Sequence, residues 1–171
     1  MCKMQSNRRL KLFLYLAVAA VAVAADQLTK YLAVLYLKPI HSFPLWQDVF
    51  HLTYLENRGA AFGMLQNQRW LFLVVTLLTV AIIVAYILYD KKMRVLTGIA
   101  LALIAGGGVG NLIDRMATGA VVDFLDFTLI NFAIFNVADI CVCVGAGLFL
   151  LSYILEEISV RKAQKDEKTD A

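Results

Sequence analysis

The chain has 171 residues, of which 61% are hydrophobic and 17% are charged. Soluble domains carry about 25% charged residues, so this chain has too little polar surface for water, and a lipid bilayer is its expected solvent. The net charge of +3 is too small to indicate a nucleic-acid partner. The three cysteines, Cys2, Cys141 and Cys143, lack the spacing of a disulfide framework or a zinc site.

Four stretches are long and apolar enough to cross a bilayer, which takes about 20 apolar residues. The first follows a basic N-terminus and imitates a cleavable secretory signal. It continues past Asp26 without a turn residue, so we interpret it as a retained helix. The predicted fold is an all-α membrane protein with one four-helix domain at 1–160, spans at 12–37, 70–89, 95–113 and 136–155, and a charged, solvated tail at 161–171.

The distribution of basic residues predicts the orientation of these helices. The N-terminal segment, the connection at 90–94 and the tail together hold 11 of the 16 Lys and Arg residues. With four spans these three segments lie on one side, which the positive-inside rule makes cytoplasmic. We therefore expect both termini in the cytoplasm, and the connections 38–69 and 115–135 outside.

The first outer connection is long for a simple loop. Its residues 50–55 alternate in part and are rich in aromatic and β-branched side chains, which predicts short strands. We expect a small extracytoplasmic β-element between the first and second helices.

Polar side chains within the spans are costly to bury, so each is a candidate functional residue. Asp26, Asn111 and Asp139 lie roughly 22 to 24 Å from the cytoplasmic ends of their helices, at a rise of about 1.5 Å per residue. Three helices thus bring polar groups to one level near the outer face. Helical spacing also places Asp114 on the face of Asn111, and Asn136 on the face of Asp139.

Packing alone explains part of this pattern. The glycines at 106–108 and 110 permit close approach of a neighbouring helix, and a buried polar network that locks the helices accounts for a single Asn–Asp pair. It accounts poorly for several acidic and amide groups at one level.

The side-chain inventory limits the chemistry available on the outer side. Ser42 is the only serine clearly outside, and Lys38, its candidate base, lies nearby but at the membrane edge, which disfavours a Ser/Lys protease. No spacing joins a Cys to a His, and no H-E-x-x-H zinc motif is present. Two aspartates held close together share one proton, so that one activates water and the other protonates the scissile carbonyl. Asp139 is one candidate, and Asp123 or Asp126 is the other, because the pattern does not separate them.

Carboxylates within spans also serve proton or cation transport. A small transporter is therefore the main alternative, although transporters usually carry internal repeats and midplane sites, and the sequence shows neither. A third interpretation is a non-catalytic membrane scaffold, which would tolerate the loss of both acids.

Five segments in order resemble the lipoprotein signal peptidase family, also called signal peptidase II. One segment alone is a weak signal, whereas five in order with the same four-span layout are specific. The segments are 26–30 (DQLTK), 57–63 (NRGAAFG), 107–115 (GGVGNLIDR), 121–124 (VVDF) and 135–139 (FNVAD).

The resemblance implies an aspartic endopeptidase that removes the signal peptide of prolipoproteins, before a cysteine that carries diacylglycerol. It implies that Asp123 and Asp139 are the catalytic pair, with Asp123 in place of Asp126. It further implies lipid-modified prolipoproteins and membrane lipids as partners, and no metal or cofactor; a monomer is the default state. The residues that line or support the site would be Asn57, Gly59, Asn111, Asp114, Arg115, Asn136, Asp26 and Lys30.

Two contacts are expected within this set. Asp26 and Lys30 stand at i, i+4 and can pair on one helix face. Arg115 is expected to offset the neighbouring carboxylate of Asp114. Asn57, without the resemblance, is explained equally well as an ordinary turn residue.

Overall fold

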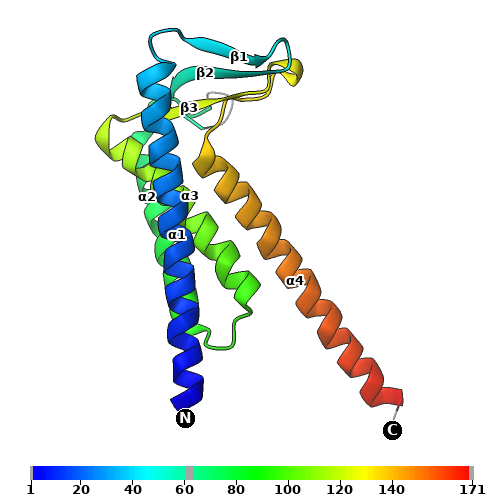
Figure 1. The fold of residues 1–171 in the computed structure, drawn as a ribbon. Coiled ribbons are helices and arrows are strands. Elements are labelled where there is room, and N and C mark those ends of the chain that lie inside the picture. The colour runs from blue at the N-terminus through cyan, green and yellow to red at the C-terminus, as the bar shows by residue number, and fades with distance from the viewer. Residues whose placement is uncertain (1, 61–63, 170–171) are drawn as a thin grey trace.

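The computed structural model describes residues 2–60 and 64–169. Residues 61–63, which end the second matching segment, lie outside the described residues, as do residues 1 and 170–171. The elements, drawn in Figure 1, are α1 (Cys2–Tyr36), β1 (Ser42–Trp46), β2 (Phe50–Asn57), α2 (Arg69–Tyr89), α3 (Val95–Ala117), β3 (Val121–Asp126), the short 3-10 helix η2 (Thr128–Ile130) and α4 (Val137–Thr169).

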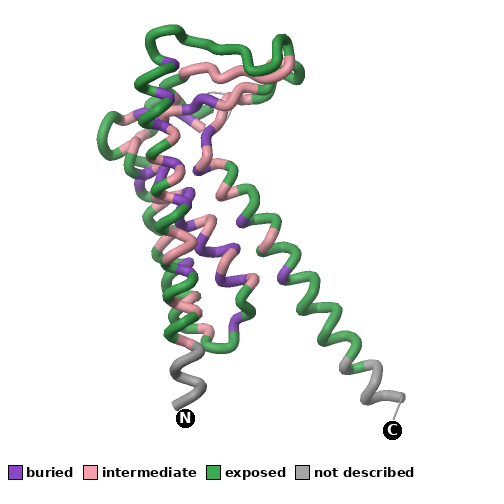
Figure 2. The backbone as a smooth tube through the Cα atoms, viewed as in Figure 1, coloured by how far each residue is buried: buried purple, intermediate pink, exposed green. Residues whose placement is uncertain are grey.

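All four predicted spans are helices long and apolar enough to cross a membrane. Helix α3 is central: it packs against α1, α2 and α4, and 50% of its most apolar stretch is buried, against 11% to 17% in the others. Figure 2 shows exposed residues along much of α4. Exposed apolar surface of this extent fits contact with lipid, because lipid tails solvate such side chains and water does not.

The tail predicted at 161–171 is not separated from the last helix. Residues up to Thr169 continue α4, and Arg161 pairs with Glu157 at i, i+4 with an N–O distance of 2.8 Å. Lys, Gln, Glu and Ala are good helix formers, which explains the extension. The orientation of the helices in the membrane stays a prediction. Of the basic residues on which it rests, Lys3, Lys165 and Lys168 have side chains that lie outside those described.

The expectation of an all-α fold with a β-element between the first two helices is incomplete. The hairpin of β1 and β2 forms in the first connection, as predicted, but a third strand joins it in the antiparallel order β1-β2-β3. This strand, β3, comes from the second connection, and β2 pairs with it from His51↔Asp126 to Asn57↔Val121. The sheet therefore connects two segments that are far apart in the sequence.

Apolar packing fixes the sheet on the helices. Ala33 of α1 and Leu37, which directly follows α1, form a buried cluster with Phe124 of β3. We call this end of the bundle, where the sheet lies, the sheet end. At the opposite, far end, Tyr15 belongs to a second apolar cluster and its ring lies against Gly98, where a Cβ would collide with it.

Candidate active site

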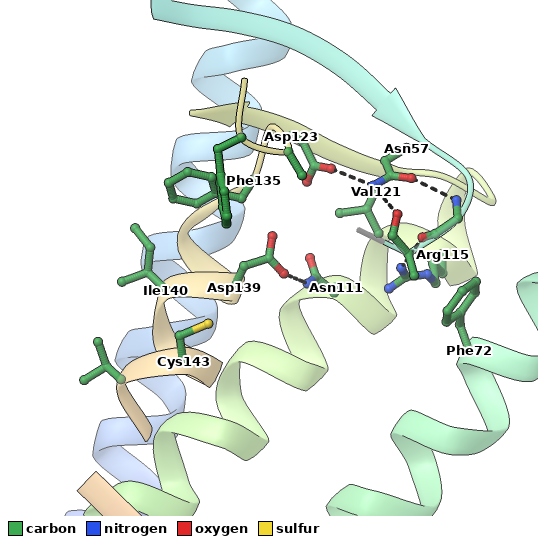
Figure 3. Close-up of a pocket in the computed structure, with 15 residues that line it drawn as sticks. Asn57, Phe72, Asn111, Arg115, Val121, Asp123, Phe135, Asp139, Ile140 and Cys143 are labelled. Atoms are coloured by element: carbon green, nitrogen blue, oxygen red, sulfur yellow. Dashed lines mark hydrogen bonds between the residues drawn. The ribbon is translucent and has the colours of Figure 1, made fainter. Parts of the chain in front are cut away.

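A pocket of about 480 Å³ opens at the sheet end, between residues of the sheet and of α2, α3 and α4 (Figure 3). Its wall combines polar groups with a larger apolar surface. The predicted site residues that line it are Asn57, Gly59, Asn111, Arg115, Asp123 and Asp139. Its apolar lining includes Phe72, Val121, Phe132, Phe135, Ile140 and Val144.

Strand β3 carries Asp123 into this pocket with only 2% of the residue exposed. Its Oδ2 accepts a hydrogen bond from Nδ2 of Asn57 at 3.0 Å, and its Oδ1 accepts one from Nδ2 of Asn136 at 2.6 Å. Burial disfavours the charged form and raises the pKa of Asp123 to about 6, the nearby charge of Asp139 adds to this, and the two amide donors oppose it. Asp123 can therefore gain or lose a proton close to neutral pH.

Asp139 lies in the first turn of α4, where the sequence forms a reciprocal cap. The Asn136 side-chain oxygen accepts the N–H of Asp139 at 3.0 Å, and Asp139 Oδ2 accepts the N–H of Asn136 at 3.1 Å. Such capping satisfies N–H groups that have no partner at a helix start. The other oxygen, Oδ1, accepts Nδ2 of Asn111 at 2.8 Å. The segment FNVAD thus starts the helix and holds its carboxylate at the pocket.

Figure 3 shows the two carboxylates pointing into the same space, one from the sheet and one from α4. Asn136, which is fully buried, joins them through its side chain to Asp123 and its backbone to Asp139. Each of the four carboxylate oxygens accepts a hydrogen bond from an amide N–H. The pair is therefore held in place on the protein side.

The structure separates Asp123 from Asp126 by position. Three residues apart on a strand, their side chains lie on opposite faces. Asp126 Oδ2 accepts the Thr53 hydroxyl at 2.8 Å, and Asp126 is not among the residues that line the pocket.

Behind the pocket lies a buried ion cluster formed by Asp26, Lys30 and Asp114. The Lys30 ammonium is 2.8 Å from Asp26 Oδ2 and 2.9 Å from Asp114 Oδ2. The predicted pairing of Asp26 with Lys30 is confirmed, as is the prediction that polar residues of α1, α3 and α4 meet at one level.

The expected pairing of Arg115 with Asp114 is wrong. Consecutive helix residues point about 100° apart, so Arg115 faces the pocket while Asp114 faces α1. The Arg115 guanidinium lies over the Phe72 ring, 4.6 Å from its centroid, and donates to the Gly59 carbonyl at 3.1 Å. Arg115 therefore holds the turn after β2 against α2.

Two residues that contribute to the site were not among the predicted site residues. Gln27 donates to Asp26 Oδ2 at 3.2 Å and to Asp114 Oδ1 at 3.0 Å; its signal was an amide within a span, next to an acid. Phe72 carried no signal, because an aromatic residue in an apolar span is ordinary.

No group of three or more His, Cys, Asp or Glu in the described part of the chain has the arrangement of a metal site. Cys141 and Cys143 of α4 are free thiols, and Cys143 lines the pocket one helical turn from Asp139. The chemical groups available there are carboxylates, amides, one guanidinium and one thiol.

These features define a multi-pass membrane protein with a pair of buried aspartates in a largely apolar pocket. Comparisons with known proteins give the family. Residues 18–155 match the model of the family described as signal peptidase (SPase) II, and the chain belongs to this family of membrane proteases.

The relatives span most of the chain. It is 51% identical to a protein of Brevibacillus brevis named lipoprotein signal peptidase, over 83% of this chain and 95% of the relative. A protein of the same name from Bacillus subtilis is 40% identical, over 88% of this chain and 99% of that one. A solved structure described as a bacterial membrane enzyme superposes with a TM-score of 0.77 at 30% identity, covering 84% and 88% of the two chains.

Proposed function

We propose that this protein is an aspartic endopeptidase that removes the signal peptide from prolipoproteins, with Asp123 and Asp139 as the catalytic pair. The observation that carries the proposal is the geometry of these carboxylates: they come from two different elements and face one pocket, and amide donors hold all four of their oxygens. Family membership supports the reaction.

In the proposed mechanism the pair carries one proton. The ionised carboxylate takes a proton from a water molecule as the water oxygen bonds to the scissile carbonyl carbon, and the protonated carboxyl gives its proton to the carbonyl oxygen. Collapse of the tetrahedral intermediate breaks the C–N bond: the amine leaves with the proton held by the pair, and one hydroxyl of the intermediate gives its proton back to the pair as the new carboxyl group forms. The raised pKa of Asp123, about 6, supports a shared proton near neutral pH.

The apolar part of the pocket supports a lipid-bearing substrate. Ile140 and Val144 stand at i, i+4 on α4, and Phe135 lies at the start of that helix, so apolar side chains continue from the carboxylates along a membrane span. We propose that cleavage occurs before a diacylglyceryl-modified cysteine, because its acyl chains remain in the bilayer while its peptide bond lies at the membrane surface.

The positive-inside argument places this pocket at the extracytoplasmic face of the cytoplasmic membrane. Residues 1–160 would form the protease domain, and residues 161–171 would lie in the cytoplasm. The carboxylate pair and its four amide donors belong to a single chain, so the proposed chemistry requires no second copy, and we propose a monomer.

The test uses the purified chain in detergent with a diacylglyceryl-modified prolipoprotein, and the shift to the mature form on a gel is followed. Asp139→Asn and unmodified substrate run in parallel. We expect cleavage by the wild type alone, and of the lipidated substrate alone. Cleavage by Asp139→Asn at the wild-type rate would remove the catalytic role, and equal cleavage of unmodified substrate would remove the lipid requirement.

A further inference from the structure

We propose that Lys30 is a positioning residue of the active site, whose ammonium fixes the direction of the Asn111 amide so that this amide donates to Asp139. The inference rests on the proposed catalytic role of Asp139. The contacts of the ammonium are with Asp26, Asp114 and Asn111. It therefore reaches the carboxylate pair through the amide and, at longer range, through its charge, which favours the ionised form of Asp123; the test below therefore keeps the net charge of the cluster constant.

The ammonium of Lys30 is enclosed and fully used. The residue is 3% exposed, and its nitrogen lies 2.8 Å from Asp26 Oδ2, 2.9 Å from Asp114 Oδ2 and 2.8 Å from Asn111 Oδ1. A lysine ammonium has three N–H donors and no acceptor. Three acceptors therefore match three donors, and the group cannot turn away from Asn111 without leaving one of its own buried N–H groups unpaired.

This contact decides which way Asn111 points. Because the ammonium can only donate, the Asn111 atom that faces it is the side-chain oxygen. The amide nitrogen must then face the other way, where it lies 2.8 Å from Asp139 Oδ1. Lys30 thus determines that Asp139 meets an N–H group and not a carbonyl oxygen.

The Asn111 oxygen also meets the second amide. Asn111 Oδ1 also accepts Nδ2 of Asn136 at 3.1 Å, and this nitrogen donates to Asp123 Oδ1 at 2.6 Å. The direction of the Asn136 amide is set by the helix cap, since its oxygen accepts the Asp139 N–H. The cation and the cap together therefore hold the Asn111 oxygen, and each carboxylate of the pair receives an N–H donor.

The cluster that holds the ammonium also joins three helices. Asp26 Oδ1 accepts the backbone N–H of Ala138 at 2.9 Å, which ties α1 to the first turn of α4. A purely structural role would follow from this tie alone. The two roles differ in one observable: a structural role changes how much protein is folded, whereas amide positioning changes the pH dependence of the folded enzyme.

Without the ammonium, the Asn111 amide can rotate and present its oxygen to Asp139. An ionised carboxylate that loses a donor, or meets a lone pair, is less stable relative to its protonated form. The acid limb of the pH–rate profile, which belongs to the carboxylate pair as a unit, is then expected at higher pH.

The main variant combines Lys30→Met with Asp114→Asn, which preserves the net charge of the three-residue cluster. Asp114→Asn alone is the matched control, since it keeps the ammonium on Asn111. With lipidated substrate, we expect the acid limb of the double variant to move up by about one pH unit, and kcat to fall about tenfold with little change in KM. The single variant is expected to keep the wild-type limb.

Lys30→Arg supplies a second test that does not remove the charge. A guanidinium also donates without accepting, so the acid limb is expected at the wild-type pH even where the rate is lower. A displaced limb in this variant overturns the proposal, as does a wild-type limb in the folded double variant.

Wild type and Asp139→Asn are measured alongside. If Asp139→Asn cleaves like the wild type, the proposed function fails, and the positioning role fails with it. If Asp139→Asn is inactive while the folded double variant keeps the wild-type profile, only the positioning role fails.

Discussion

The two ends of the bundle use the same helices in different ways. At the far end, α3 meets α1 through the Tyr15 ring on Gly98, and it meets α4 through one buried hydrogen bond of 2.7 Å between the hydroxyls of Thr97 and Ser152. At the sheet end, the same helices meet through the ion cluster, the two buried amides and the carboxylate of Asp139.

The far end shows how little polarity helix packing requires. Apolar side chains, one buried hydroxyl pair and two bonds from basic side chains to backbone carbonyls join the helices there, without a buried ion pair or carboxylate among the described contacts. The sheet end contains many more polar groups, each costly to bury in a span. Packing does not account for that excess, whereas the proposed catalytic role does. The predictions below test this contrast by changing one end at a time.

The largest expected effect is at the carboxylate pair. Asp123→Asn should lower kcat by at least about 100-fold, because an amide of nearly the same shape cannot exchange a proton with water. Thermal unfolding should change little. Asp126→Asn, on the opposite face of the same strand, is the matched control; an equal loss of cleavage there would contradict the assignment.

The second effect separates the two ends by glycine substitution. Gly110→Ala places a Cβ against the carboxylate of Asp26, and Gly98→Ala places one against the Tyr15 ring. Overpacking costs about 1 to 3 kcal/mol at either position, so both variants should unfold at lower temperature. Only Gly110→Ala should also lower kcat, since Asp26 is tied to the start of α4. Equal losses of kcat in the folded fractions would remove the contrast.

A smaller effect concerns pH. Asn57 donates to Asp123 and opposes the rise of its pKa, which burial brings to about 6. Asn57→Ala should therefore raise that pKa further, by about 0.7 unit for a hydrogen bond worth about 1 kcal/mol. The limb of the pH–rate profile should move to higher pH, and a shift to lower pH would contradict the role of this amide.

The raised pKa also has a consequence for stability, with a fixed sign. A carboxyl whose pKa is higher in the folded state stabilises the fold below its unfolded pKa of about 4, and this contribution disappears as pH rises through about 6. The melting temperature of wild type should therefore fall relative to that of Asp123→Asn as pH rises from about 4 to about 7. Parallel curves would show that Asp123 titrates as it does in the unfolded chain.

The smallest effect belongs to the far end. Ser152→Ala leaves the Thr97 hydroxyl without its partner and should reduce the free energy of unfolding by about 1 kcal/mol. Cleavage by the folded protein should be unchanged, because Ser152 is remote from the pocket lining. A loss of kcat comparable to that of Gly110→Ala would show that the two ends are coupled.

Local patterns in the sequence were sufficient for the helices and for the level of the polar side chains. Hydropathy locates the spans, and the helical rise brings Asn111 and Asp139 to the same depth, as their hydrogen bond confirms. The pairing of Asp26 with Lys30 follows from i, i+4 spacing on one helix.

Contacts between distant segments were not predictable in the same way. Strand β3 forms because β2 supplies its partner from the other connection, and nothing in residues 121–126 specifies that neighbour. Arg115 pairs with a carbonyl and an aromatic ring instead of Asp114, since Lys30 from α1 already occupies that carboxylate. The preference for Asp123 over Asp126 came from family resemblance, and the strand explains it through alternation of faces.

The hydrogen bond from Ala138 to Asp26 spans 112 residues of chain, which matters for biogenesis. The ribosome adds about 5 to 20 residues per second, so α1 waits roughly 6 to 22 seconds for the helix that completes its ion cluster. Near the end of that interval the nascent chain contains Asp123 but not Asp139. On the proposed mechanism, a newly made molecule therefore cannot attack neighbouring proteins in the membrane until its last helix has been inserted.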